Sequence, residues 1–353
     1  MQQIQKEITF PFLTPPALAQ ARDPERLLRG IQSYVQLFRE YNTPHNPDKY
    51  AGLSHEVVWT NDISALQYYA PEESVKLKGP ILLVPSLINT ARIFDLTQNC
   101  SMISHLTQQG HPLYLLNWGA LADYNATLTL QDAQKSILQE GLEAASSHAQ
   151  SSLHLFGYCL GGALLLNAGH NIQKYAASII LAAVPVNFHA KETPWSHLLG
   201  KLSSMSTLIE RRGNLSKQML QSFFAQVSPE NVISKYMRLV DEDLSEAEVD
   251  LFIAVEIWLN SGSDLPCSLA IDILEQFFER DCLMDKAKLG LPCLLIAPQN
   301  DRLVPDAASR PADRLFDRTD TLKPECGHIG MMAGRRAKTD VWQPVSDWVS
   351  DRA

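Results

Sequence analysis

The sequence predicts an α/β protein whose mostly parallel sheet is interrupted by a large helical insertion. Apolar runs of strand length alternate with helical stretches over residues 80–185. This alternation is typical of a parallel sheet with helices on both faces. From about residue 188 to residue 288 the periodicity is helical only, and a strand-like apolar run then returns at 292–298. We interpret the helical block as a cap inserted over the carboxyl ends of the strands.

The first predicted element is a helix that starts near residue 23. Asp23 can cap it, Pro24 suits its first turn, and apolar residues recur on one face at Leu27, Leu28, Ile31, Val35 and Phe38. After a polar loop, "EVVWT" and "SALQYYA" are typical of two short strands at a sheet edge. We therefore assign residues 1–50 to an N-terminal helical extension and begin the core at residue 51.

The predicted buried strands are continuous apolar runs, as expected of strands covered on both faces. They are "PILLVPS" (80–86), "PLYLLNW" (112–118), "LHLFGY" (153–158), "ASIILAAVP" (177–185) and "PCLLIAP" (292–298). Helices are expected between them at 93–109, at 130–149 and after residue 160, and a last helix contains Val345, Trp348 and Val349. The predicted core is therefore 51–187 together with 289–353.

The predicted cap spans residues 188–288, and no strand is expected in it. Its clearest helix, 245–259, begins with a capping box formed by Ser245 and Glu248.

Composition excludes several classes of protein. The 353 residues carry a net charge of −9, which argues against a nucleic-acid or anionic-membrane partner, because phosphate binding needs clustered Lys and Arg. The six cysteines form no Cys-x-x-Cys pair, so no metal site is predicted.

The N-terminus lacks the charge pattern of a secretion signal, and no apolar run reaches the roughly 18 residues of a spanning helix. A cytoplasmic location without a transmembrane segment is expected.

One short motif could carry chemistry. The stretch Gly157-Tyr158-Cys159-Leu160-Gly161-Gly162 follows a predicted strand and precedes a predicted helix. This is the context of a nucleophile elbow, here with Cys in place of Ser, because only small neighbours let strand and helix approach around a strained central residue. The Leu160 N–H would then face a developing oxyanion. The alternative is a buried cysteine at an ordinary glycine-rich turn.

A nucleophile needs a base and a group that orients the base, and two residues occur in the required order. Asp301 follows the strand "PCLLIAP", and His328 lies in the glycine-rich loop "ECGHIGMM". Taken singly, Asp301 is typical of a turn and His328 of a surface loop. Together with Cys159 they predict a catalytic triad at one edge of the sheet. The loop after the first core strand should supply a second oxyanion N–H, which we assign to the Leu87 backbone.

Other candidates rank lower. His154 lies in the strand before the elbow and is expected to pack in the core, whereas His189 opens the helical insertion. Cys326 is close to His328 in sequence, but a metal site there would need further ligands.

Several stretches together resemble the polyhydroxyalkanoate synthases, which have an α/β-hydrolase core. The resemblance rests on Gly-x-Cys-x-Gly-Gly at 157–162 and on "VPSLINTARIFDL", "YLLNWG", "NDRLVP" and "CGHIGMMAG", and it covers roughly residues 80–348. It implies that Cys159 carries a growing hydroxyacyl chain as a thioester. It also implies that His328 activates Cys159 and that Asp301 supports His328 or activates the incoming 3-hydroxyl.

The same resemblance implies a substrate and partners. The acyl donor would be a 3-hydroxyacyl-coenzyme A, with no resident cofactor. The chain is close in length to synthases that work with a second subunit, and a homodimer and the surface of a polyester granule are further candidate partners. In one stretch the sequence departs from the family, whose members often have Trp followed directly by Asn. Here, in "WLNSGSDLP", Leu259 separates Trp258 from Asn260.

Two other functions stay open on the sequence. One is a cysteine hydrolase of the same fold acting on thioesters, polyesters or lactones, and the other is a granule-binding homologue without catalysis. The residue type favours acyl transfer, because exchange between a thiolate and a coenzyme A thioester is nearly isoenergetic.

Overall fold

The computed structural model describes residues 23–41, 52–121, 127–196, 199, 202–227, 235–240 and 243–352. Residues 1–22, for which the sequence predicts no secretion signal, lie outside the described residues.

Within the described residues, eight strands form one sheet in the order β1-β2-β6-β3-β7-β8-β11-β12. Their bounds are β1 (Glu56–Thr60), β2 (Ala65–Tyr69), β3 (Ile81–Val84), β6 (Leu113–Asn117), β7 (Leu153–Tyr158), β8 (Ala176–Ala182), β11 (Leu289–Ile296) and β12 (Phe316–Leu322). Neighbouring strands from β6 to β12 are parallel, whereas β1 and β2 form an antiparallel edge. The prediction of a mostly parallel α/β sheet is confirmed.

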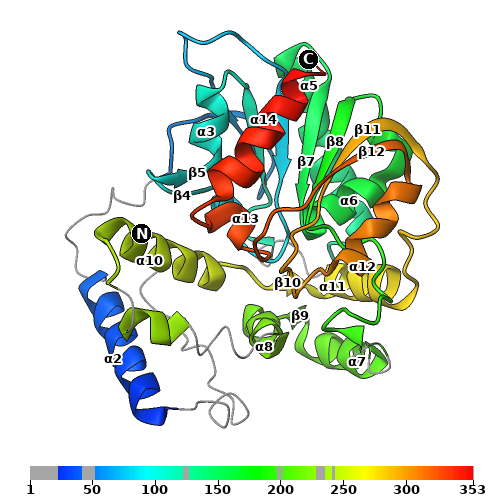
Figure 1. Cartoon of the computed structure of the whole chain (residues 1–353). Coiled ribbons are helices and arrows are strands. Elements are labelled where there is room, and N and C mark those ends of the chain that lie inside the picture. Colours follow the sequence, from blue (N-terminus) through cyan, green and yellow to red (C-terminus); the bar gives the residue numbers. More distant parts are fainter. Residues whose placement is uncertain are drawn as a thin grey trace.

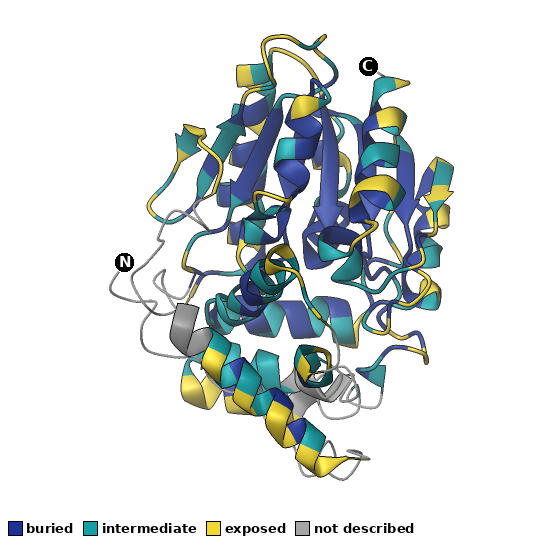
Figure 2. Ribbon diagram, turned by 60° about the vertical axis from the view of Figure 1, so that its left-hand side comes forward, coloured by how far each residue is buried: buried dark blue, intermediate teal, exposed yellow. Residues whose placement is uncertain are grey.

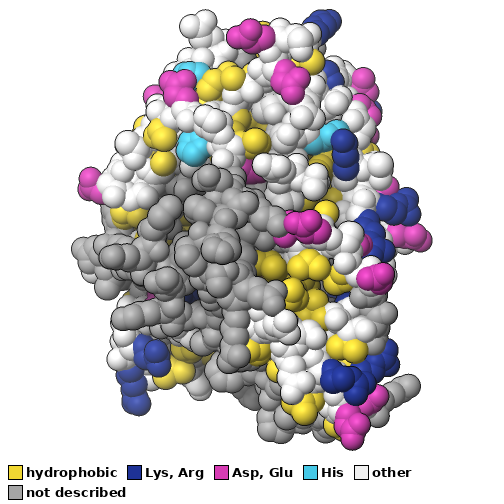
Figure 3. All heavy atoms as spheres, turned by 90° about the vertical axis from the view of Figure 1, so that its left-hand side faces the viewer, with side chains coloured by type: hydrophobic (Ala, Val, Ile, Leu, Met, Phe, Trp, Pro, Cys, Tyr) yellow, Lys and Arg dark blue, Asp and Glu magenta, His cyan; other side chains and the backbone are white. Residues whose placement is uncertain are grey.

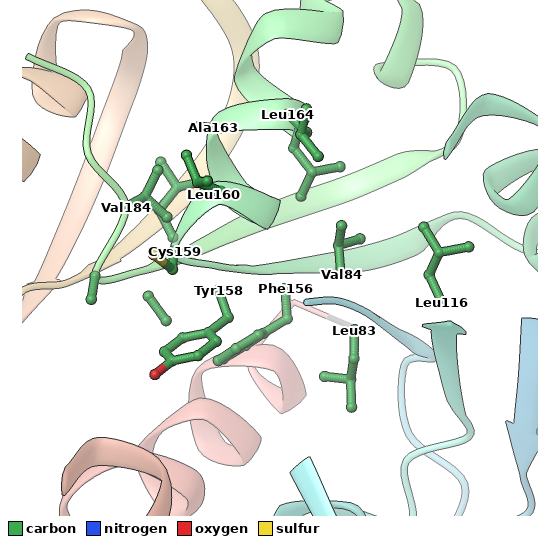
Figure 4. Close-up of a cluster of buried hydrophobic side chains, with 14 of the residues drawn as sticks. Leu83, Val84, Leu116, Phe156, Tyr158, Cys159, Leu160, Ala163, Leu164 and Val184 are labelled. Atoms are coloured by element: carbon green, nitrogen blue, oxygen red, sulfur yellow. The ribbon is translucent and has the colours of Figure 1, made fainter. Parts of the chain in front are cut away.

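Helices cover both faces of this sheet. They are α3 (Met102–Gln108), α4 (Leu130–Ala133), α5 (Glu140–Ala149), α6 (Leu160–Ala168), α12 (Asp306–Ser309), α13 (Gly330–Ala333) and α14 (Gln343–Ser350). In Figure 4, α6 lies on one side of the strands and the C-terminal helices lie on the other. Strands β3 and β7 lie between these layers and are buried along their whole length (Figure 2), which explains their largely apolar sequences.

The helical block lies beyond the carboxyl ends of the parallel strands (Figure 1). It contains α7 (Leu202–Arg212), α8 (Lys217–Val227), α10 (Glu246–Asn260) and α11 (Cys267–Ile273). The capping box predicted for Ser245 and Glu248 is present at the start of α10. The prediction that the block holds no strand is wrong, since β9 (Asn214–Leu215) pairs with β10 (Leu265–Pro266). Two residues per strand are too few to show a period of two in the sequence.

The predicted helix 93–109 is wrong in its first half. Residues Ala91–Phe94 form a 3₁₀ turn, and a small hairpin of β4 (Asp95–Thr97) and β5 (Cys100–Ser101) follows. The Thr97 hydroxyl accepts the Cys100 N–H and closes the hairpin turn. The helix begins only at Met102, because the Ser101 side chain caps it by accepting the Ser104 N–H.

The first described helix, α2 (Pro24–Tyr41), starts as predicted, with the Asp23 carboxylate accepting the Arg26 N–H at 2.9 Å. It packs against the helical block, where Tyr34 makes edge-to-face contacts with Tyr236 and with Phe252 of α10. The boundaries 1–50, 51–187, 188–288 and 289–353 remain a prediction.

The face shown in Figure 3 mixes acidic and basic side chains rather than gathering one sign of charge. In the part of the chain that the structure describes, no helix combines the length and hydropathy needed to cross a bilayer.

Candidate active site

Cys159 sits where β7 passes into α6 (Figure 4). Its backbone has φ 53° and ψ −126°, an unusual conformation for a residue with a side chain. Hydrogen bonds hold it there: its N–H donates to the Ala182 carbonyl at 3.0 Å, and its carbonyl accepts the Gly162 N–H at 3.0 Å. The structure therefore has the strained turn that a nucleophile elbow requires.

Gly161 explains why the motif needs small residues. A Cβ at this position would lie 2.2 Å from the Val84 carbonyl oxygen and 2.5 Å from that of Pro85. Both contacts are with backbone atoms, which cannot move aside. The absent side chain thus lets the elbow touch the end of β3 and the loop that follows it.

Asp301 and His328 meet at the same edge of the sheet, in the loops after β11 and β12. The His328 Nδ1 lies 2.7 Å from Asp301 Oδ2. The other oxygen, Oδ1, accepts the N–H groups of Leu303 and Val304 at 2.9 and 2.8 Å. The Asp301 side chain is fully buried, so its carboxylate is committed to these partners and holds the imidazole in one orientation.

The imidazole also contacts the nucleophile. Burial alone would lower the pKa of His328, but the charges of Asp301 and Cys159 and side-chain hydrogen bonds to both raise it to about 10. His328 is therefore protonated at neutral pH. The Cys159 residue is only 8% exposed and the His328 side chain 12%, so little water reaches the pair.

Tyr158 is a residue that the sequence reasoning missed. Its hydroxyl donates to the His328 carbonyl at 3.3 Å, and its ring lies 5.3 Å from the imidazole, centroid to centroid. Burial first, and then the charges of Cys159 and Asp301, raise its pKa well above the usual value, so it remains a donor. No local pattern marks this contact, because Tyr158 and His328 are 170 positions apart in the chain.

The two backbone groups expected to bind an oxyanion also lie near the elbow. Leu160 is the first residue of α6, so its N–H has no acceptor within the helix. Leu87 is buried in the loop after β3, two residues beyond the Pro85 carbonyl that approaches Gly161.

The lower-ranked residues lie elsewhere or are inert. His154 packs in the core as predicted, with Nδ1 2.8 Å from the Ser178 hydroxyl. His189 contacts the Phe278 carbonyl in the helical block. Burial and nearby carboxylates raise the pKa of Cys326 to about 11, which keeps it a neutral thiol. Among the described residues, no group of three or more His, Cys, Asp or Glu side chains could hold a metal ion.

Comparison with known proteins gives a consistent set of relatives. Residues 49–106 match the family model "Poly-beta-hydroxybutyrate polymerase (PhaC) N-terminus". The chain is 28% identical over 317 residues to the "Poly(3-hydroxyalkanoate) polymerase subunit PhaC" of Haloferax mediterranei, covering 85% of this chain but 64% of that relative. It is 24% identical over 350 residues to the protein of the same name from Synechocystis sp., covering 93% and 91% of the two chains. The resemblance to polyhydroxyalkanoate synthases is confirmed.

Solved structures show the fold. An esterase from Thermogutta terrifontis superposes with a TM-score of 0.55 at 13% identity, covering 85% of this chain and 99% of that one. A monoacylglycerol lipase from Paleococcus ferrophilus gives 0.51 at 14% identity, covering 85% and 100%. The predicted α/β-hydrolase fold is confirmed.

Proposed function

We propose that this chain is a polyhydroxyalkanoate synthase, an acyltransferase that polymerises 3-hydroxyacyl-coenzyme A through a thioester on Cys159. The observation that carries the proposal is the line of contacts from Asp301 through His328 to a cysteine at a strained elbow. The polymerase names of the relatives support the choice of substrate.

The first step is exchange of one thioester for another. The Cys159 thiolate attacks the carbonyl carbon of the acyl-coenzyme A, and the N–H groups of Leu160 and Leu87 stabilise the oxyanion that forms. The tetrahedral intermediate breaks its bond to the coenzyme A sulfur, which leaves with the proton of His328. The products are an acyl-Cys159 thioester, free coenzyme A and a neutral imidazole.

The second step uses that neutral imidazole as a base. His328 takes the proton of an incoming 3-hydroxyl, whose oxygen attacks the acyl-Cys159 carbonyl. An ester bond forms, the bond to sulfur breaks, and the thiolate–imidazolium pair returns. We assign Asp301 to orienting His328 rather than to direct contact with the hydroxyl, because both carboxylate oxygens already have partners.

The nearly closed site suits transfer better than hydrolysis. Water competes poorly for a thioester on a residue that is 8% exposed, and a thioester retains the energy needed to pass the chain on. We further propose a cytoplasmic, granule-associated enzyme with coenzyme A only as part of the substrate. Its partners would be a second synthase subunit, as the "subunit" in the relatives' names suggests, or a second copy of this chain.

The test offers the purified protein 3-hydroxybutyryl-coenzyme A, with and without a candidate second subunit. Release of coenzyme A together with insoluble polymer is expected, and Cys159→Ala should reduce both by at least about 10³-fold while remaining folded. Coenzyme A with soluble 3-hydroxy acid would instead identify a hydrolase. No release under either condition would contradict both catalytic functions and leave the granule-binding alternative.

A further inference from the structure

The loop after β3, residues 85–90, is fixed to the core on one side. The indole N–H of Trp118 donates to the Pro85 carbonyl at 3.0 Å, and the same carbonyl packs against Gly161 of the elbow. The Ser86 hydroxyl accepts the Ile88 N–H at 3.2 Å, which constrains the turn around Leu87.

The same loop is fixed to the helical block on its other side, by the end of α10 and the residues that follow it. The indole N–H of Trp258 donates to the Thr90 carbonyl at 2.8 Å, and the Asn89 amide donates to the Trp258 carbonyl at 3.2 Å. The hydroxyls of Thr90 and Ser261 are 2.9 Å apart.

Gly262 brings the two backbones into direct contact. A Cβ on Gly262 would lie 2.3 Å from the Ile88 carbonyl oxygen, a distance that real Cβ atoms do not adopt. Residues 88–90 and residues 258–262 thus form a junction with three polar contacts. The two backbones approach so closely there that position 262 has room only for glycine.

We propose that this junction is a positioning element of the active site, which places the Leu87 N–H in the oxyanion hole when the helical block is docked. The inference rests on the proposed role of Cys159 as an acyl acceptor. Leu87 lies between the part of the loop held by the core and the part held by the block. Loss of the junction would free residues 88–90 and let the Leu87 N–H turn away, and a donor works only when its orientation is fixed before charge develops.

The test compares two reactions of Cys159 that differ in their need for an oxyanion hole. Alkylation by iodoacetamide forms a carbon–sulfur bond as iodide leaves, and no oxyanion develops. Acylation by p-nitrophenyl butyrate passes through a tetrahedral oxyanion and releases p-nitrophenolate. A junction that positions Leu87 should therefore affect acylation alone.

Gly262→Ala is the main variant, and Gly290→Ala is its matched control, because a Cβ on Gly290 meets nothing closer than 3.9 Å. Gly262→Ala is expected to slow acylation by about 10–10²-fold, less than the roughly 10²–10³-fold cost of removing one oxyanion donor because the Leu87 N–H is misaligned and not lost, and to change alkylation by less than about threefold. Trp258→Phe, which removes one donor and keeps an aromatic ring, should show the same selectivity at about 3–10-fold. This milder variant keeps the test valid if Gly262→Ala does not fold.

Equal slowing of both reactions would overturn the proposal, because the junction would then control access to Cys159 rather than the oxyanion hole. Unchanged acylation in both variants would overturn it as well. A wild-type protein that reacts with the ester but not with 3-hydroxybutyryl-coenzyme A would refute the proposed substrate and leave this inference standing.

Discussion

The resting protonation state of His328 follows from its neighbours rather than from histidine itself. Asp301 is buried and accepts the Nδ1–H, and the Cys159 side chain also interacts with the imidazole. Asp301 and the interaction with Cys159 outweigh the cost of burying the imidazolium, so His328 holds the proton that the proposed mechanism passes to the leaving sulfur.

This arrangement predicts a pH dependence of stability. The pKa of His328 is raised from 6.5 to about 10, so the folded protein binds more protons than the unfolded chain between these values. The stabilisation is fully present below pH 6.5 and is lost as the pH rises through about 10. The free energy of unfolding, measured in urea from pH 6 to pH 10, should fall with pH by at most about 1.4 kcal/mol per unit from this group.

Asp301→Asn removes the carboxylate and should lower the pKa of His328, which reduces that slope. Asp317→Asn is the matched control, since Asp317 is an exposed carboxylate on β12 that pairs with the exposed Lys288. If wild type and Asp301→Asn lose stability equally over this range, Asp301 does not set the protonation of His328.

At the level of elements, a buried polar network ties the N-terminal helix to the block. Glu256 of α10 is 3% exposed and accepts the Tyr34 hydroxyl of α2 at 2.9 Å. Lys235 donates to both oxygens of Glu256 at 2.8 and 2.9 Å and lies over the ring of Tyr34. The carboxylate is thereby paired and hydrogen-bonded, which a buried charge requires.

Tyr34→Phe should therefore destabilise the protein by about 1.5–3 kcal/mol, the usual range for a hydrogen bond to a buried charged group. Tyr175→Phe removes a hydroxyl that reaches the exposed Glu143 at 3.4 Å and should cost less than about 0.5 kcal/mol. Urea unfolding of both variants provides the comparison. Equal losses would mean that Glu256 gains nothing from its tyrosine partner.

Elements with long periodic patterns were predictable from the sequence, and elements defined by short contacts were not. The largely apolar sequences of β3, β7 and residues 293–296 of β11 predicted the buried strands, because both faces of these segments are covered. The β4–β5 hairpin interrupts a helix-like pattern at Thr97, where one side-chain hydrogen bond decides the local structure.

The same distinction applies to the candidate site. Its chain order and loop positions predicted that Asp301 and His328 would meet, and the structure places them 2.7 Å apart. The contact of Tyr158 with His328 and the junction of Trp258 with Thr90 join residues 168 or more positions apart and carry no local signature. Such contacts depend on how the packed layers meet, which periodicity does not specify.

At the scale of the whole molecule, the chain builds one sheet from two segments separated by the helical block. β11 pairs with β8 in parallel register after the excursion, and β12 completes the edge. The segment after the block thus contributes Asp301 and His328, and the segment before it contributes Cys159. Chemistry at Cys159 therefore requires the sheet to be complete, and the helical block lies beyond the carboxyl ends of the parallel strands (Figure 1).

Two buried cysteines can report on these two units separately. Cys159 is 8% exposed at the edge that faces the block, whereas Cys293 is fully buried in β11, paired with Ile179 of β8 and Thr319 of β12. Opening of the block should expose Cys159 while the sheet still protects Cys293, since elements with fewer buried contacts open at lower free energy than the core.

Pulse alkylation with iodoacetamide across a urea series, read by peptide mass spectrometry, should therefore give Cys159 the lower urea midpoint. The pulse is kept too short to label Cys159 in the folded protein, and the labelling of each thiol is normalised to that of the fully unfolded chain. Coincident midpoints would mean that block and sheet unfold as a single cooperative unit.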